Sequence, residues 1–177
     1  MKPEKSFYKD IIKPVVVLLV ICLSVSLILG VANAVTAPII RENELAAALK
    51  NRQELLPDAT GFTELDYSDN PQIRSVHSDD GGSGVIVVTE MPGYGGLIIT
   101  TVAIDSNGQV LGLRIDSSTE TKGIGTQVSG DRFMGGFIGK DRDTLSVDTI
   151  TNATYSSRAV IDSVNAALRA FDEVKGG

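Results

Sequence analysis

The sequence predicts an α+β protein with one N-terminal transmembrane helix followed by a single domain, an antiparallel sheet packed by helices. A long uncharged apolar segment, a group of β-branched segments and an amphipathic C-terminal pattern favour this architecture. We expect three parts: a short cytoplasmic N-terminus at 1–13, a transmembrane helix at 14–40 and an extracytoplasmic domain at 41–177.

The apolar segment has no Asp, Glu, Lys, Arg or His over the 27 residues 14–40. Since roughly 20 helical residues cross a hydrocarbon core of about 30 Å, it is long enough to span a membrane. The preceding residues carry Lys2, Lys5, Lys9 and Lys13 against Glu4 and Asp10. This bias predicts a single-pass protein of the cell membrane, with the N-terminus cytoplasmic and the domain on the extracytoplasmic face.

A cleaved signal peptide is the alternative, because Ala32-Asn33-Ala34 has the small-x-small form of a cleavage site. However, the apolar stretch exceeds the usual signal core of roughly 7 to 15 residues and continues past this point. Gly30, Ala32 and Ala34 also suit close packing against other membrane helices. We therefore expect an uncleaved N-terminus, and a mature chain beginning at Val35 would contradict this.

The composition after residue 40 excludes several classes of function. Of the chain's 16 basic and 22 acidic residues, four lysines and two acidic groups precede residue 41, which leaves a net charge of −8. A nucleic-acid partner is not expected, since basic residues are not clustered. The single Cys22 lies in the apolar segment and His77 is the only histidine, so neither a disulfide nor a metal site is expected.

The pattern of the domain predicts its elements in order. Residues 41–56 favour a helix that ends at Pro57, and 58–83 favour short strands and loops. Strands are predicted at 85–88, 97–104 and 110–115, with a hairpin at Asn107-Gly108. On the second of these, Ile98, Val102 and Ile104 can line one face while Thr101 points away.

A C-terminal helix is predicted after Ser156-Ser157, whose hydroxyls suit the capping of its first N–H groups. Its apolar positions, which should cover the sheet, are Val160, Ile161, Val164, Leu168 and Phe171.

Two segments could carry chemistry. Thr154, just ahead of the C-terminal helix, is placed either to cap the helix or to hold a phosphate at the positive end of the helix dipole. The loop at 120–126 has two glycines two residues apart. It is either a flexible turn or a backbone that approaches a flat ligand or phosphate closely, with Glu120, Thr121 and Thr126 as polar groups.

Four motifs together resemble a known family over most of the chain: Gly93-Tyr94-Gly95-Gly96, the loop 120–126, Phe137-Ile138-Gly139-Lys140, and 148–154. Their order and spacing are similar to those of the FMN-binding domain in the G subunit of the Rnf electron transport complex and in its relative, the C subunit of the Na⁺-translocating NADH:quinone reductase. In that family the last motif reads Asp-x-x-Ser/Thr-Gly-Ala-Thr, and its final Thr carries FMN through a phosphoester installed by a separate flavin transferase.

The resemblance implies covalent FMN on Thr154, within a flavinylation motif formed by Asp148, Thr151, Asn152, Ala153 and Thr154. It implies FMN contacts from Tyr94, Gly95, Glu120, Thr121, Gly123, Ile124, Gly125, Thr126 and Ala153. Asn152 departs from the family's Gly; if the turn needs a positive φ, Asn is among the least costly replacements. Asn152-Ala153-Thr154 is also formally a glycosylation sequon, which we regard as coincidental.

By resemblance, the expected function is electron transfer in a membrane complex that couples ferredoxin and NAD⁺ redox to Na⁺ or H⁺ movement, with other subunits and lipid as partners. The chain alone should have no turnover, and no G-x-G-x-x-G motif follows a predicted strand, so NADH is expected to bind elsewhere. Two alternatives stay open: a solitary membrane-anchored extracytoplasmic flavoprotein, and a non-redox anchored binding or scaffold domain, to which Asn152 points.

Overall fold

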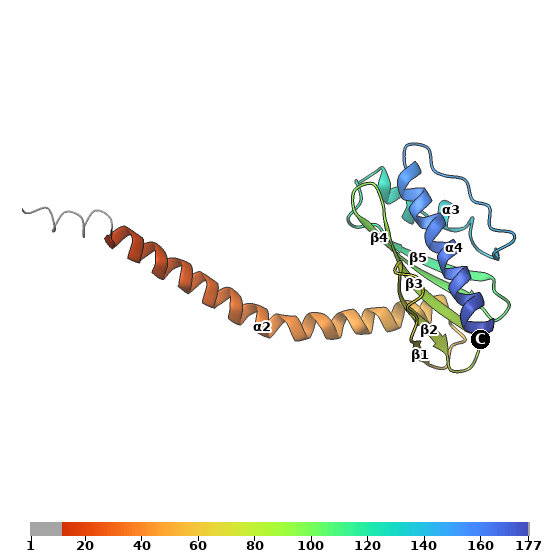
Figure 1. Cartoon of the computed structure of the whole chain (residues 1–177), viewed down its shortest axis with the longest axis horizontal. Helices are drawn as coiled ribbons and strands as arrows, with labels where there is room; N and C mark the ends of the chain where they lie inside the picture. Colours follow the sequence, from red (N-terminus) through yellow and green to blue (C-terminus); the bar gives the residue numbers. More distant parts are fainter. Residues whose placement is uncertain (1–11, 177) are drawn as a thin grey trace, which may run out of the picture. The chain divides into compact units, whose positions relative to one another are not determined.

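The computed structural model describes residues 12–176, which form one long helix, a five-stranded sheet and a covering helix (Figure 1). The chain divides between residues 49 and 50 into two compact units. Lys2, Lys5 and Lys9, on which the predicted orientation rests, lie outside the described residues.

The N-terminal helix α2 runs from Lys13–Leu55 without interruption, so the predicted segments 14–40 and 41–56 form one helix. It is long and apolar enough to anchor the protein in a membrane, and no residue of it is buried. Two hydroxyls in the apolar part donate to carbonyls one turn back, Ser24 to Val20 and Thr36 to Ala32. Such internal bonds suit a helix in lipid, where water cannot satisfy polar groups.

The sheet is an antiparallel meander in the order β1-β2-β3-β4-β5. Its strands are β1 Phe62–Leu65, β2 Ile73–Asp79, β3 Gly84–Pro92, β4 Leu97–Asp105 and β5 Val110–Asp116. The three predicted apolar strands are confirmed as β3, β4 and β5, and the predicted short strands within 58–83 as β1 and β2.

The predicted hairpin joins β4 to β5 through the four residues 106–109. Gly108 has a φ of 84°, whereas Asn107 is not among the residues with positive φ. The loop is therefore not the two-residue type I′ turn that Asn-Gly most often forms. Asp105 organises it instead, because its Oδ1 accepts the N–H of Asn107 at 2.8 Å and of Gln109 at 2.9 Å.

The C-terminal helix α4, Thr154–Gly176, crosses one face of the sheet (Figure 1). Its buried Val160, Val164 and Leu168 join Ile98, Val102 and Ile104 of β4 in the main core, as the sequence predicts. The opposite face of the sheet carries a smaller cluster of Leu56, Ala59, Ile86 and Ala103. Apolar side chains are thus buried on both faces of the sheet.

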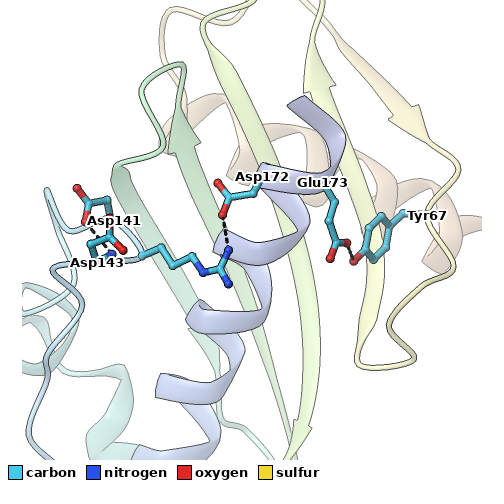
Figure 2. A network of polar contacts seen from close by, with 6 residues as sticks. Tyr67, Asp141, Asp143, Asp172 and Glu173 are labelled. Atoms are coloured by element: carbon cyan, nitrogen blue, oxygen red, sulfur yellow. Dashed lines mark hydrogen bonds and ion pairs between the residues drawn. The ribbon is translucent and has the colours of Figure 1, made fainter. Parts of the chain in front are cut away.

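Polar contacts hold the C-terminal half of α4 (Figure 2). Arg142 Nη1 lies 2.9 Å from Asp172 Oδ2, and the Tyr67 hydroxyl donates to Glu173. Partial burial of the Tyr67 hydroxyl and, to a smaller extent, its hydrogen bond to Glu173 raise the pKa of Tyr67 to about 12. These contacts tie the segments at 65–69 and 140–144 to the helix.

A buried carboxylate secures the β2–β3 turn. Asp79 Oδ1 accepts the N–H of Thr60 at 2.8 Å, and Asp79 Oδ2 accepts the N–H and hydroxyl of Ser83 at 2.8 and 2.7 Å. Hydrogen bonds from Ser83 hold the pKa of Asp79 well below its usual range. This turn lies at the end of β3 that begins at Gly84, whereas the loop 93–96 lies at the other end.

Candidate functional site: a pocket at the start of α4

A pocket of about 380 Å³ lies where the first turn of α4 meets the loop after β3 and the start of the 3₁₀ helix η2 (Gly125–Ser129). Its lining residues are Tyr94, Ile124, Gly125, Asn152, Ala153, Thr154, Tyr155 and Ser156. Its volume is within the range of about 300–1,000 Å³ usual for small-molecule sites.

The helix α4 begins at Thr154, so the prediction that it begins after Ser156-Ser157 is wrong. The Ala153 carbonyl already accepts the N–H of Ser157 at 2.8 Å, which is a helical i→i−4 bond. Ser156 and Ser157 therefore lie inside the first turn, and their hydroxyls do not cap it. Thr154 becomes the first helical residue, with an exposed side chain beside the pocket.

The backbone turns into the helix through Asn152, which has a φ of 69°. Among the described residues it is the only one other than glycine with positive φ. Asparagine tolerates this left-handed region better than most residues, because its short polar side chain can bond locally. The turn therefore does need a positive φ at residue 152, which is the condition under which Asn is among the least costly replacements for Gly.

The loop 120–126 holds itself together with its own polar groups. The Thr126 hydroxyl accepts the N–H of Gly123 at 2.9 Å, and the Thr121 carbonyl accepts the N–H of Ile124 at 3.2 Å. Gly123 has a φ of 77° and an open position, which glycine adopts without strain. The loop leads through Ile124 and the buried Gly125 to the pocket wall.

Glu120 does not line the pocket but lies buried behind it, 5% exposed. Both of its carboxylate oxygens lie 3.2 Å from the N–H of Gly95, and Oε2 accepts the Ser156 hydroxyl at 3.1 Å. Its polar atoms are therefore directed at the protein.

Of the predicted FMN contacts, the structure brings Tyr94, Ile124, Gly125, Ala153 and Thr154 together at the pocket. Gly95, Glu120, Thr121, Gly123 and Thr126 are not among its lining residues. Within the predicted flavinylation motif, Asn152, Ala153 and Thr154 line this pocket. Asp148 and Thr151 instead line a separate pocket of about 690 Å³, together with residues of the helix α3 (Asp131–Met134).

Sequence reasoning missed Tyr155 and Ser156, which also line the pocket. The Tyr155 ring is 72% exposed and lies 6.4 Å, centroid to centroid, from the Tyr94 ring, itself 75% exposed. Large exposed aromatic rings are costly to leave in water, and their pairing beside Thr154 indicates a binding surface. A tyrosine directly after the candidate attachment residue was the available signal.

The fold and the pocket define an α+β domain with an open site at a helix N-terminus, preceded by a helix that is long and apolar enough to cross a membrane. Residues 93–169 match the family described as the FMN-binding domain, so this part of the chain is similar to the domains of that family. Every residue that lines the pocket falls within this match.

Over most of its length the chain is similar to the G subunits of ion-translocating oxidoreductase complexes. It is 26% identical to the G subunit of the proton-translocating ferredoxin:NAD(+) oxidoreductase complex of Clostridium ljungdahlii, covering 90% of this chain and 91% of the relative. It is 26% identical to the G subunit of the Na(+)-translocating ferredoxin:NAD(+) oxidoreductase complex of Acetobacterium woodii, covering 94% of each. The G subunit of an ion-translocating oxidoreductase complex of Pseudomonas aeruginosa is 32% identical, covering 51% of this chain and 49% of the relative. The predicted relationship to the G subunits is confirmed.

The residues at the pocket fit FMN. Among the described residues, the backbone N–H groups of Thr154, Tyr155 and Ser156 have no hydrogen-bond acceptor, as expected for the first turn of a helix, and such groups bind phosphate. Tyr94, Tyr155 and the 45% exposed Ile124 offer an aromatic and apolar surface to a flat ring. Phosphate donors and ring-binding surface thus lie in one pocket.

Proposed function

We propose that this protein carries FMN as a phosphoester on Thr154 and serves as an electron carrier of a membrane complex. The observation that supports this most directly is the exposed Thr154 side chain, at the first residue of α4 and on the wall of the pocket. An attached phosphate at this position lies beside the free N–H groups of the helix start, where negative charge is favoured.

When bound, FMN supplies the redox chemistry, and the protein supplies its position and surroundings. The first-turn N–H groups of α4 would bind the phosphate oxygens. Tyr94, Tyr155 and Ile124 would pack against the ring and exclude water from part of it. The helix dipole adds a positive partial charge at the phosphate end of the site.

Attachment is assigned to a separate flavin transferase. A self-catalysed attack by the Thr154 hydroxyl needs an adjacent general base. The only histidine of the chain, His77, is buried on β2 with a ring nitrogen 3.0 Å from the Ser75 hydroxyl, and it is not among the pocket residues. Exposed Asp148, the first residue of the motif, is a candidate for contact with the transferase.

Within the complex, we assign the protein to electron transfer between other redox subunits, coupling ferredoxin and NAD⁺ to ion movement, as the names of its relatives suggest. The two relatives quoted at 26% identity are named for different ions, H⁺ and Na⁺, so similarity favours neither ion here. In this proposal α2 crosses the membrane lipid, the N-terminus is cytoplasmic, and the domain is extracytoplasmic.

The test is to express the full chain together with its flavin transferase, denature it, and look for flavin fluorescence that migrates with the polypeptide. We expect a fluorescent wild-type band and a dark Thr154→Val band, because valine keeps the shape of threonine without the attachment oxygen. Thr149→Val is the matched control, since this exposed threonine occupies a variable position of the motif and does not line the pocket of Thr154. A dark wild type or a fluorescent Thr154→Val variant contradicts the proposal.

A further inference from the structure

Glu120 is a buried carboxylate without a cation. It is 5% exposed, and none of the ion pairs among the described residues includes it. Its only side-chain hydrogen bonds in that part of the chain come from the Gly95 N–H and the Ser156 hydroxyl. Burying an ionisable group is costly unless its hydrogen bonds repay the loss of water, so this placement calls for an explanation.

The contacts of Glu120 fall on the direct neighbours of the three exposed hydrophobic side chains of the pocket. Gly95 follows Tyr94, and Ser156 follows Tyr155. Gly125, which follows Ile124, packs so closely that a Cβ there would overlap the Glu120 carboxylate. One side chain therefore joins three segments that are distant in sequence.

The glycine before Tyr94 shows the same close approach. A Cβ on Gly93 would also overlap the Glu120 carboxylate, so the backbone on both sides of Tyr94 is drawn toward this group. The Gly93 N–H donates to the Gly96 carbonyl at 2.7 Å, which closes the turn that presents Tyr94. The tyrosine projects outward while its flanking backbone is held inward, as its 75% exposure shows.

We infer that Glu120 is a positioning residue that sets the spacing of Tyr94, Tyr155 and Ile124, and so holds the wall against which the flavin ring packs. It acts through Gly95, Ser156 and Gly125, and makes no contact with the ring itself. The inference rests on the proposed function for the identity of the ligand, but the bracing of the wall is a property of the protein alone.

Replacement by glutamine tests this role with little change of shape. An amide has one oxygen and one NH₂ group, and the Gly95 nitrogen lies 3.2 Å from both carboxylate oxygens, so in either orientation the amide NH₂ group faces the Gly95 N–H. A buried donor without an acceptor is costly, and the wall should move to relieve it. Ser156→Ala removes one of the two donors, leaves a good helix former in the first turn, and should act in the same direction more weakly.

The first readout is the fluorescence of the flavin-loaded full chain, because a flavin ring packed against tyrosine is quenched by electron transfer from the phenol. We expect the folded wild type to be quenched relative to its denatured form. The flavin fluorescence of the folded Glu120→Gln variant should be about twofold or more that of the folded wild type, because the tyrosine wall moves away from the flavin ring. Ser156→Ala should give a smaller rise.

Asp79→Asn is the matched control, since it also converts a buried carboxylate to an amide but lies beyond the opposite end of β3. Over the nine residues of this strand, the ends are separated by roughly 26 Å. The control should destabilise the domain and leave the quenching unchanged. If Glu120→Gln keeps wild-type quenching, or if Asp79→Asn relieves it equally, the positioning role is wrong.

The second readout needs no flavin. The chain contains no tryptophan, so Tyr155→Trp introduces a single indole into the pocket wall of the full chain. Adding Glu120→Gln to this variant should lower the fluorescence anisotropy of the indole, because the wall that holds it loosens. If the Glu120→Gln protein does not fold, Ser156→Ala takes its place. If the anisotropy is unchanged by these substitutions, the inference is wrong. If the anisotropy falls but the wild-type protein never binds flavin, only the proposed function is contradicted.

Discussion

Replacing Asn152 with alanine isolates the cost of the backbone turn that leads into the pocket. Residue 152 has a φ of 69°, and a residue with a Cβ pays roughly 1–2 kcal/mol to adopt such a left-handed conformation. Asparagine adopts this region at less cost than alanine, so Asn152→Ala should cost about 1 kcal/mol. Asn152→Gly relieves the strain but enlarges the unfolded ensemble by about 0.4–1 kcal/mol, so it should be nearly neutral.

Thermal unfolding of the three proteins measures this directly. For a domain of this size, about 1 kcal/mol corresponds to roughly 4 °C in Tm. Thr151→Ala is the control, because this exposed neighbour has no positive φ. Flavin loading should follow the same order, with glycine equal to asparagine and alanine lower. If the Asn152→Ala variant has the same Tm as the wild type, the backbone at residue 152 does not require the left-handed conformation.

Two further predictions concern pH. Hydrogen bonds hold the pKa of Asp79 in the folded protein below its ordinary value. The contribution of Asp79 to stability should therefore be complete at a pH above the ordinary pKa, and it should disappear as the pH falls through the lowered pKa of the folded state. Asp79→Asn should therefore lower Tm by several degrees at pH 7, and the difference from wild type should narrow in acid; a constant difference contradicts this. Tyr67, with its pKa raised to about 12, should stabilise the fold fully below pH 10 and lose this contribution as the pH rises from 10 through 12. Tyr67→Phe should remove that alkaline step, and ultraviolet titration of tyrosinate should show one late-titrating group absent from the variant.

Local patterns were sufficient for the elements of the fold. β-branched alternation predicted β4, and helical spacing predicted that Val160, Val164 and Leu168 cover the sheet. The start of α4 was mispredicted because serine usually caps helices, whereas here the left-handed Asn152 sets the entry and the helical bonds begin at Ala153. Cap preference is a local signal, and the turn conformation that overrides it is not visible in residue types alone.

The site was predictable only where motif and pocket coincide. Thr154 and Tyr94 could be named from the sequence, and both line the pocket. The placement of Glu120 could not, because its partners Gly95 and Ser156 lie 25 and 36 positions away and meet it only in the folded domain. A motif identifies which residues matter together, but the direction of a buried side chain depends on packing between distant segments.

The openness of the pocket bears on why the proposed covalent bond to FMN would suit this protein. Tyr94 and Tyr155 remain largely exposed, so this wall would bury less of a flat ring than a closed pocket would. Such a surface binds a free cofactor weakly, since little apolar area leaves water. In our proposal, the bond to Thr154 makes binding intramolecular, with an effective concentration near the millimolar range of short tethers. The other side of the ring would then remain open to a redox partner, because Tyr94 and Tyr155 leave the site largely exposed.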